Sequence, residues 1–298
     1  MDLNKTLFID TVIDPLLERM KCCDLCPRNC GVNRLENEKG ICNTGRNAMV
    51  SSFGPHFGEE SCLVGTHGSG TIFFTNCNLL CNFCQNFEIS HQGRGQEVSD
   101  EDLADIMLHL QFRGCHNINL VSPSHVIPQI VSALKIAIEK GLGLPVVYNT
   151  GGYDQLDSIR ALEGIVDIYM PDIKFSESAV SYDCCDAPDY FEVVKKAVIE
   201  MHRQTGDLEI DRQKIARKGV LIRHLVMPGD LAGTSDVMTF IASEISVDSY
   251  VNIMSQYNPS GKVLHHPILG RRVNSEEYNY ALAVAKSRGL YRFGQDED

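Results

Sequence analysis

The sequence predicts an α/β fold in which a partial, TIM-like (β/α)6 barrel follows a small cysteine-rich amino-terminal module. Two observations support this prediction. From about residue 70 onward short apolar runs alternate with helical segments, whereas the stretch before it is rich in Cys, Gly and Asn. With 298 residues the chain is long enough for one large core. We therefore expect the module over residues 1–68 and the barrel over residues 69–298.

The predicted module begins with a helix and continues into a loop region that carries most of the cysteines. After the helix, residues 22–68 contain two short apolar runs, AMVSSF at 48–53 and ESCLVG at 60–65. We expect both runs to form small antiparallel strands. The amino terminus itself is interrupted by Asp10, Asp14 and Pro15, so it lacks the unbroken apolar region of a secretion signal.

Six apolar runs, all rich in Val, Ile, Phe or Tyr, are predicted to form buried parallel strands. They cover residues 71–75, 117–122, 145–149, 165–170, 220–226 and 250–254. Strands and helices in alternation imply right-handed crossovers and a parallel sheet. Six units make a partial barrel, because a closed barrel of this kind needs eight.

The intervening helices are indicated by caps and by glycine stops. Residues 99–114 open with Ser99 and Asp102 at capping-box spacing and end at a glycine, and residues 126–141 also end at a glycine. Residues 274–289 open with Asn274 and Glu277 at the same spacing. The polar stretch at about 204–218 is predicted to be an excursion before the fifth strand.

Charge and cysteine content narrow the class of protein. The chain has 27 basic and 39 acidic residues and a net charge of −12, without a run of Lys and Arg, so nucleic acid and anionic membranes are not expected partners. No apolar stretch approaches the roughly 18 residues that span a bilayer. We expect a cytoplasmic protein. Its twelve cysteines would then stay reduced, which favours metal or cluster ligation over disulfides.

Three cysteines directly follow the first predicted barrel strand. The segment NCNLLCNFCQN places Cys77, Cys81 and Cys84 with three and then two residues between them. Three thiolates on one loop can hold three irons of a four-iron, four-sulfur cluster and leave the fourth iron open to a ligand. A structural zinc site needs a fourth protein ligand, and the nearest candidate, His91, lies seven residues beyond Cys84. The loop therefore predicts a cluster with an open site.

At this loop the sequence resembles the radical S-adenosylmethionine (SAM) superfamily, which has an aromatic residue before the last cysteine, here Phe83. The resemblance implies that SAM binds the open iron of a 4Fe–4S cluster. It further implies that an electron, from an external donor such as flavodoxin or ferredoxin, cleaves SAM to methionine and a 5′-deoxyadenosyl radical. That radical abstracts hydrogen from a substrate.

More of the chain looks like the pyruvate formate-lyase activating enzymes, above all their PflX-type relatives. The similarity lies in CPRNCGVNR, CNLLCNFCQN, YNTGGY, MPDIKF and RHLVMPG. It implies a glycyl radical enzyme as protein substrate. It also implies SAM-binding or cation-binding roles at the strand ends and in the loop, at Phe83, Asn86, Asn149, Thr150, Asp172, Lys174 and Arg223. A plain strand-end ion pair is the alternative for Asp172 and Lys174.

One segment departs from the activating enzymes. They usually carry a Gly-Gly-Glu-like segment after the second strand, which binds the SAM amino group, whereas this chain has NLVSPSHV. Ser122, Ser124 or a backbone carbonyl would have to accept that hydrogen bond. The departure keeps open a radical SAM enzyme that acts on a small molecule or another peptide.

Four further cysteines lie in the amino-terminal module. Cys23, Cys26, Cys30 and Cys42 are separated by two, three and eleven residues. They suit either a zinc site or a fully ligated second cluster, and unligated thiols are the third alternative. Either metal would stabilise a module too small for a core of its own. A non-catalytic module held together by metal is the functional alternative from a different class, but it leaves the open-site loop unexplained.

Overall fold

The computed structural model describes residues 3–294, and it contains all six predicted barrel strands. They are β2 (Ser69–Phe74), β4 (Ile118–Val121), β5 (Val146–Thr150), β6 (Ile168–Pro171), β8 (Ala216–Leu225) and β9 (Tyr250–Met254). Each pairs in parallel with the next one in this order. The predicted α/β class and partial six-unit barrel are confirmed.

Four further strands extend or decorate this sheet. β1 (Ala48–His56) pairs antiparallel with β2, and β3 (Gln96–Val98) pairs antiparallel with β1. At the other edge β10 (Arg292–Phe293) continues parallel to β9, while β7 (Glu209–Ile210) forms an antiparallel pair with β8 inside the predicted excursion. Because β1 joins the barrel sheet, the segment before residue 69 is hydrogen-bonded directly to the segment after it.

One predicted strand of the amino-terminal segment is wrong. Residues 48–53 do lie in a strand, but the run at 60–65 forms the short helix α2 (Ser61–Val64). Within this helix the adjacent residues Cys62 and Leu63 are both fully buried. Successive side chains of a strand point to opposite faces, so a half-buried strand cannot bury both of them, whereas a helical turn can.

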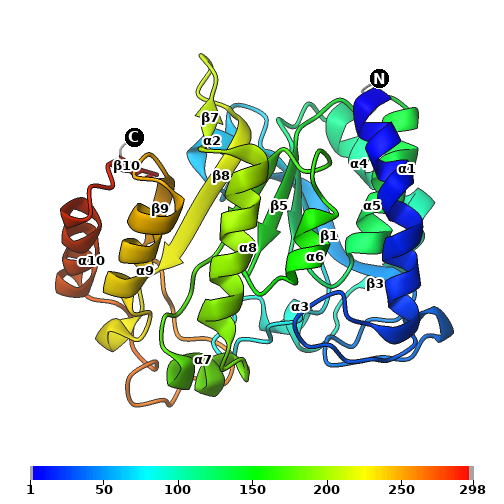
Figure 1. Cartoon of the computed structure of the whole chain (residues 1–298). Helices are drawn as coiled ribbons and strands as arrows, with labels where there is room; N and C mark the ends of the chain where they lie inside the picture. Colours follow the sequence, from blue (N-terminus) through cyan, green and yellow to red (C-terminus); the bar gives the residue numbers. More distant parts are fainter. Residues whose placement is uncertain (1–2, 295–298) are drawn as a thin grey trace.

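Helices cover the outside of the sheet (Figure 1). The longer ones are α1 (Leu3–Glu18), α4 (Asp100–Phe112), α5 (Ile127–Glu139), α7 (Ser178–Cys185), α8 (Tyr190–Thr205) and α10 (Ser275–Ser287). The shorter ones are α3 (Phe87–Ser90), α6 (Leu156–Arg160), α9 (Thr234–Phe240) and the turns η1 (Arg19–Cys22), η2 (Arg34–Glu36), η3 (Pro228–Asp230) and η4 (Ile241–Ile245). Both predicted capping boxes are present, at Ser99 with Asp102 and at Asn274 with Glu277.

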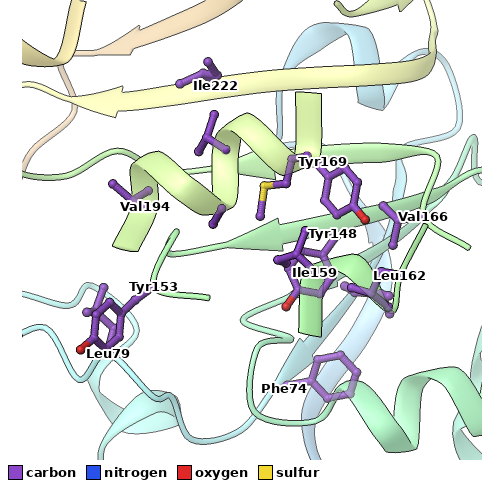
Figure 2. Close-up of a cluster of buried hydrophobic side chains, with 14 of the residues drawn as sticks. Phe74, Leu79, Tyr148, Tyr153, Ile159, Leu162, Val166, Tyr169, Val194 and Ile222 are labelled. Atoms are coloured by element: carbon purple, nitrogen blue, oxygen red, sulfur yellow. The ribbon is translucent and has the colours of Figure 1, made fainter. Parts of the chain in front are cut away.

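The main core lies between the strands and the outer helices (Figure 2). Tyr148 of β5 and Tyr169 of β6 are fully buried and meet edge to face, with ring centroids 5.8 Å apart. Each phenol has a partner, since Tyr148 donates to Asp154 Oδ1 and Tyr169 to Gln204 Oε1. Satisfied phenols allow large aromatic side chains to fill the core without an unpaired hydroxyl.

The carboxyl end of the barrel is where irregular segments gather. In Figure 1 the arrow of β8 points to the lower side of the view, where α3, α7 and the amino-terminal loop after α1 also lie. In barrels of this type, reactive groups are supplied by the loops at the strands' carboxyl ends. Among residues 3–294, no helix has the length and apolar character that a bilayer crossing requires.

Candidate functional site

The three-cysteine loop directly follows β2, at the carboxyl end of that strand. Asn76 and Leu80 adopt left-handed backbone conformations, with φ of 73° and 54°, which tighten the loop around its thiols. The backbone N–H of Leu79 donates to Cys77 Sγ at 3.4 Å, and Ser90 Oγ at the end of α3 donates to Cys84 Sγ at 3.3 Å. Donors aimed at sulfur are typical of loops that hold iron–sulfur clusters.

The three thiols lie in an environment in which a bound cation would stabilise their ionised form. Burial raises the pKa of Cys77 to about 12, with the charge of Cys81 adding to the effect, and burial also raises the pKa of Cys84. The pKa of Cys81 is lowered, first by a hydrogen bond with Cys185 and then by the charge of Lys174. Three crowded thiolates are stable only beside positive charge, and the donor set therefore fits three irons of a cluster.

A cavity of about 400 Å³ opens beside this loop. It brings two cysteines of the loop together with residues from the ends of β5, β6 and β8. Of the predicted site residues it is lined by Cys81, Phe83, Cys84, Asn86, Asn149, Asp172, Lys174 and Arg223. The cavity thus joins predicted site residues that lie up to 142 positions apart in the chain, from Cys81 to Arg223.

The charges at the cavity wall are centred on Asp172. Lys174 Nζ lies 2.5 Å from Asp172 Oδ2, and Arg223 Nε lies 2.7 Å from Asp172 Oδ1. Burial opposes ionisation of Asp172, but the charges of Arg223 and Lys174 outweigh it and hold its pKa below the usual value. All three side chains are therefore charged and fixed in place at neutral pH.

Arg223 also connects residues that the sequence left apart. Its Nη2 donates to Asn149 Oδ1 at 2.8 Å, and its Nη1 lies 3.7 Å from Glu59 and 3.6 Å from Glu60. Both glutamates precede α2, and Glu59 lines the cavity. Burial raises the pKa of Glu59 even beside Arg223. Sequence patterns did not single out these carboxylates, because Glu59 lies outside every motif and Glu60 only begins the run at 60–65 that is predicted to form a strand.

Three residues predicted to bind SAM lie outside the cavity lining. Ser124 Oγ pairs with Thr150 Oγ1 at 3.1 Å, and Thr150 donates to Asp154 Oδ2 at 2.6 Å. Ser124 and Thr150 are buried within this polar network, whereas Ser122 is half-buried, with a left-handed φ of 59°. Their roles toward SAM stay predictions.

Aromatic and amide side chains complete the wall. Phe83 is buried between Phe175 and Tyr257, with ring centroids 5.9 and 6.0 Å away. Asn86 immediately precedes α3. Further lining residues that the sequence did not indicate are Gln85, Gln256, Tyr257 and Asn258. The wall therefore offers apolar rings near the thiols and amide groups beyond them.

The carboxyl end of α7 packs against the three-cysteine loop. Cys185 Sγ lies 3.3 Å from Cys81 Sγ, and the backbone N–H of Asn82 donates to Cys184 O. Sequence patterns do not single out this cysteine pair. Both are buried, and Cys185 is in direct contact with a predicted ligand, which only the packing of α7 reveals.

Arg28 of the amino-terminal loop ties two segments together. Its guanidinium donates to the carbonyls of Asn78 and Leu79 in the three-cysteine loop, and to those of Cys185 and Asp186 at the end of α7. It also stacks over the ring of Tyr153, 5.2 Å from the ring centroid. The amino-terminal loop therefore forms part of the support of the three-cysteine loop.

The amino-terminal cysteines are gathered in this same loop. Burial raises the pKa of Cys26 to about 12, and the charges of Cys42, Cys23 and Cys30 act on it in the same direction. Cys23, Cys26 and Cys42 are buried, and Cys30 is half-buried. Within the described residues, no three His, Cys, Asp or Glu side chains converge as the ligands of a single metal ion do.

Comparison with known proteins identifies the family. Residues 71–230 match the family model described as the radical SAM superfamily. An uncharacterized protein of Methanocaldococcus jannaschii is 31% identical over 294 residues, which cover 96% of this chain and 80% of that protein. The chain therefore belongs to the radical SAM superfamily, whose members carry a 4Fe–4S cluster and use SAM.

The fold has a relative among solved structures. The crystal structure of a radical SAM methyltransferase from Sphaerobacter thermophilus matches with a TM-score of 0.52 and 13% identity. The match covers 75% of this chain and 66% of that one, just under two thirds of its length. At this identity the likeness shows a common fold.

Proposed function

We propose that this radical SAM enzyme cleaves SAM reductively and abstracts hydrogen from a polypeptide, with a glycyl radical enzyme as the first candidate. The observation that carries the proposal is the cavity itself, in which Cys81 and Cys84 face Asn149, Asp172 and Arg223. Bound SAM, cleaved at a carbon–sulfur bond by one electron from the cluster, supplies methionine and a 5′-deoxyadenosyl radical.

The chain's own residues would hold SAM by charge and hydrogen bonding. Arg223 offers a fixed guanidinium to a carboxylate, and Glu59 and Glu60 offer carboxylates near it to an ammonium or sulfonium group. Phe83 and Tyr257 provide an apolar wall, which limits the access of water to a reactive radical. Asp172 and Lys174 fix these groups in position.

A polypeptide substrate is favoured by the amide side chains of the wall. Gln85, Gln256 and Asn258 both donate and accept hydrogen bonds, as backbone recognition requires. The likeness of the motifs to the pyruvate formate-lyase activating enzymes, above all to the PflX-type branch, supports the same choice. Flavodoxin or ferredoxin is the proposed electron donor. Cys23, Cys26, Cys30 and Cys42 are proposed to bind a second metal centre, either zinc or an iron–sulfur cluster.

The experiment that tests the proposal is anaerobic reconstitution with iron and sulfide, followed by reduction and measurement of 5′-deoxyadenosine. We expect 5′-deoxyadenosine to form from SAM in the wild type and not in Cys81→Ala. An intact cluster without any cleavage would overturn the catalytic proposal.

A second assay addresses the substrate. Candidate glycyl radical enzymes, deuterated at the glycine Cα, should transfer deuterium into 5′-deoxyadenosine. Transfer only from a deuterated metabolite extract would replace the polypeptide by a small molecule.

A further inference from the structure

A buried arginine lies among the amino-terminal cysteines without a charged partner. Arg34 in η2 is only 1% exposed. Its Nε donates to Gly45 O at 3.1 Å and its Nη1 to His125 O at 2.7 Å. Nη1 also lies 4.0 Å from Cys23 Sγ, and Nη2 is buried without any hydrogen-bond partner.

Such an arginine is costly unless an anion lies next to it. Within the described part of the chain, Arg34 has no ion pair with Asp or Glu, in contrast to Arg223, which has three carboxylates around it. Burying a lone guanidinium is unfavourable by several kcal/mol. The surrounding carbonyls supply dipoles but no net charge, so the negative charge has to come from the thiols.

The backbone approaches the sulfur of Cys30 closely at two neighbouring positions. The backbone N–H of Ile41 donates to Cys30 Sγ at 3.4 Å. A Cβ atom at Gly40 would come within 2.6 Å of the same sulfur, so only glycine permits the approach. This contact places the segment that contains Cys42 next to Cys30. It resembles the hydrogen bond from the backbone N–H of Leu79 to Cys77 Sγ in the three-cysteine loop.

The spacing suits zinc as well as a cluster, but the geometry favours a cluster, because within residues 3–294 no three potential ligands converge as those of a single metal ion do. Cys23, Cys26 and Cys30 have two and then three residues between them, the reverse of the spacing in the three-cysteine loop of the catalytic site. The difference is Cys42, which adds a fourth thiolate. Four thiolates close the coordination of a four-iron cluster, and such a cluster with its thiolates carries a net negative charge.

We propose that Cys23, Cys26, Cys30 and Cys42 hold a second, fully ligated 4Fe–4S cluster, and that Arg34 is the buried cation that balances its charge. The inference rests on the second metal centre of the proposed function and makes it specific. With no open iron this cluster does not bind SAM. It stabilises the loop that carries Arg28 and thereby the catalytic loop.

The first test separates the two centres by metal content. In full-length protein reconstituted anaerobically, the triple variant Cys77→Ala, Cys81→Ala, Cys84→Ala should keep about four iron and four sulfide per chain, and the wild type about twice as much. The triple variant should show the electron paramagnetic resonance (EPR) signal of a reduced cluster that added SAM does not alter. Zinc in place of iron, or loss of all iron from a folded triple variant, would overturn the proposal.

A spectroscopic test needs no variant. Reduced wild type should show two overlapping EPR signals, of which SAM shifts one and leaves the other unchanged. A single signal that SAM shifts completely, at about four iron per chain, would also overturn the proposal. Both readouts are independent of SAM cleavage, so a failure of the catalytic proposal would leave this result interpretable.

The role of Arg34 has its own test. Removal of a neighbouring positive charge disfavours the more negative, reduced state of a cluster. In the triple variant that lacks Cys77, Cys81 and Cys84, Arg34→Gln should therefore lower the reduction potential, measured by EPR-monitored titration. Arg34→Lys, which keeps the positive charge, should leave the potential close to that of the triple variant. Equal potentials in Arg34→Gln and in the unsubstituted background, at equal iron content, would contradict the assignment of Arg34.

Discussion

The two cysteine loops of this molecule have similar spacing but different surroundings. The loop at Cys77–Cys84 follows a barrel strand and borders a cavity whose buried charges are paired around Asp172. The loop at Cys23–Cys42 contributes Arg28 and Ile41 to a different cavity, of about 320 Å³. Its buried guanidinium, that of Arg34, forms no ion pair with Asp or Glu among residues 3–294, and its Nη2 has no hydrogen-bond partner. On our proposal, the same residue type in related spacing serves an open site in one place and a closed site in the other, and the surroundings of each loop make the difference.

The largest expected effect comes from removing one cysteine of each loop. Cys81→Ala should reduce SAM cleavage to background, because the cluster with the open iron is lost. Cys42→Ala should lower iron content by about half and leave cleavage detectable with a chemical reductant. Iron analysis and 5′-deoxyadenosine assays measure both variants side by side. Complete loss of cleavage in a folded Cys42→Ala protein would break the distinction between the loops.

The paired charges of the catalytic side come next. Asp172→Asn leaves Lys174 and Arg223 buried together without their common carboxylate. The free energy of unfolding should fall by about 3–5 kcal/mol, measured by urea denaturation of the cluster-free protein. The double variant Asp172→Asn with Lys174→Met should recover part of this loss. A fall below about 1 kcal/mol would mean that the ion pairs add little.

The link between the loops should have a smaller effect. Arg28→Met removes hydrogen bonds to carbonyls of the three-cysteine loop and of the end of α7. The free energy of unfolding should fall by about 2 kcal/mol. Hydrogen exchange within residues 77–84 should become faster. The matched control is Arg94→Met, whose pair with Glu88 is exposed and should change stability by less than about 0.5 kcal/mol. Unchanged exchange in the Arg28 variant would show that the loops are independent.

The smallest expected effect is a pH dependence at Glu59. Burial raises the pKa of this carboxyl, so the folded chain retains its proton at pH values where the unfolded chain has lost it. Stability should therefore decrease as pH rises from the ordinary carboxyl value to the raised one. In Glu59→Gln this decrease should be absent, and in Glu36→Gln, at an exposed position, it should persist. Urea denaturation across this pH range gives the comparison.

The barrel could be predicted because its elements are local patterns. Each of the six apolar runs and each capped helix can be recognised from its own residues. The right-handed crossover rule then fixes how the strands are arranged in the sheet. The run at 60–65 failed because its apolar neighbours Cys62 and Leu63 suit a short strand as well as a helical turn. Only the packing of both side chains into the core decides between the two.

The site was predictable where chemistry follows a strand. Cys81, Asn149 and Asp172 were found because strand ends in a parallel barrel share one edge. Glu59 could not be found in this way, since its partner Arg223 is 164 positions away in sequence. The contact of Cys185 with Cys81 likewise depends on how α7 packs.

The sequence by itself determined the fold class and the superfamily and predicted which cysteines bind metal, since these depend on periodicity, spacing and residue chemistry. The tertiary structure alone decided which charges meet. It paired Arg223 with three carboxylates and left Arg34 among thiols. The physical reason is that a buried charge is defined by its neighbours in space, and most of those neighbours are distant in sequence.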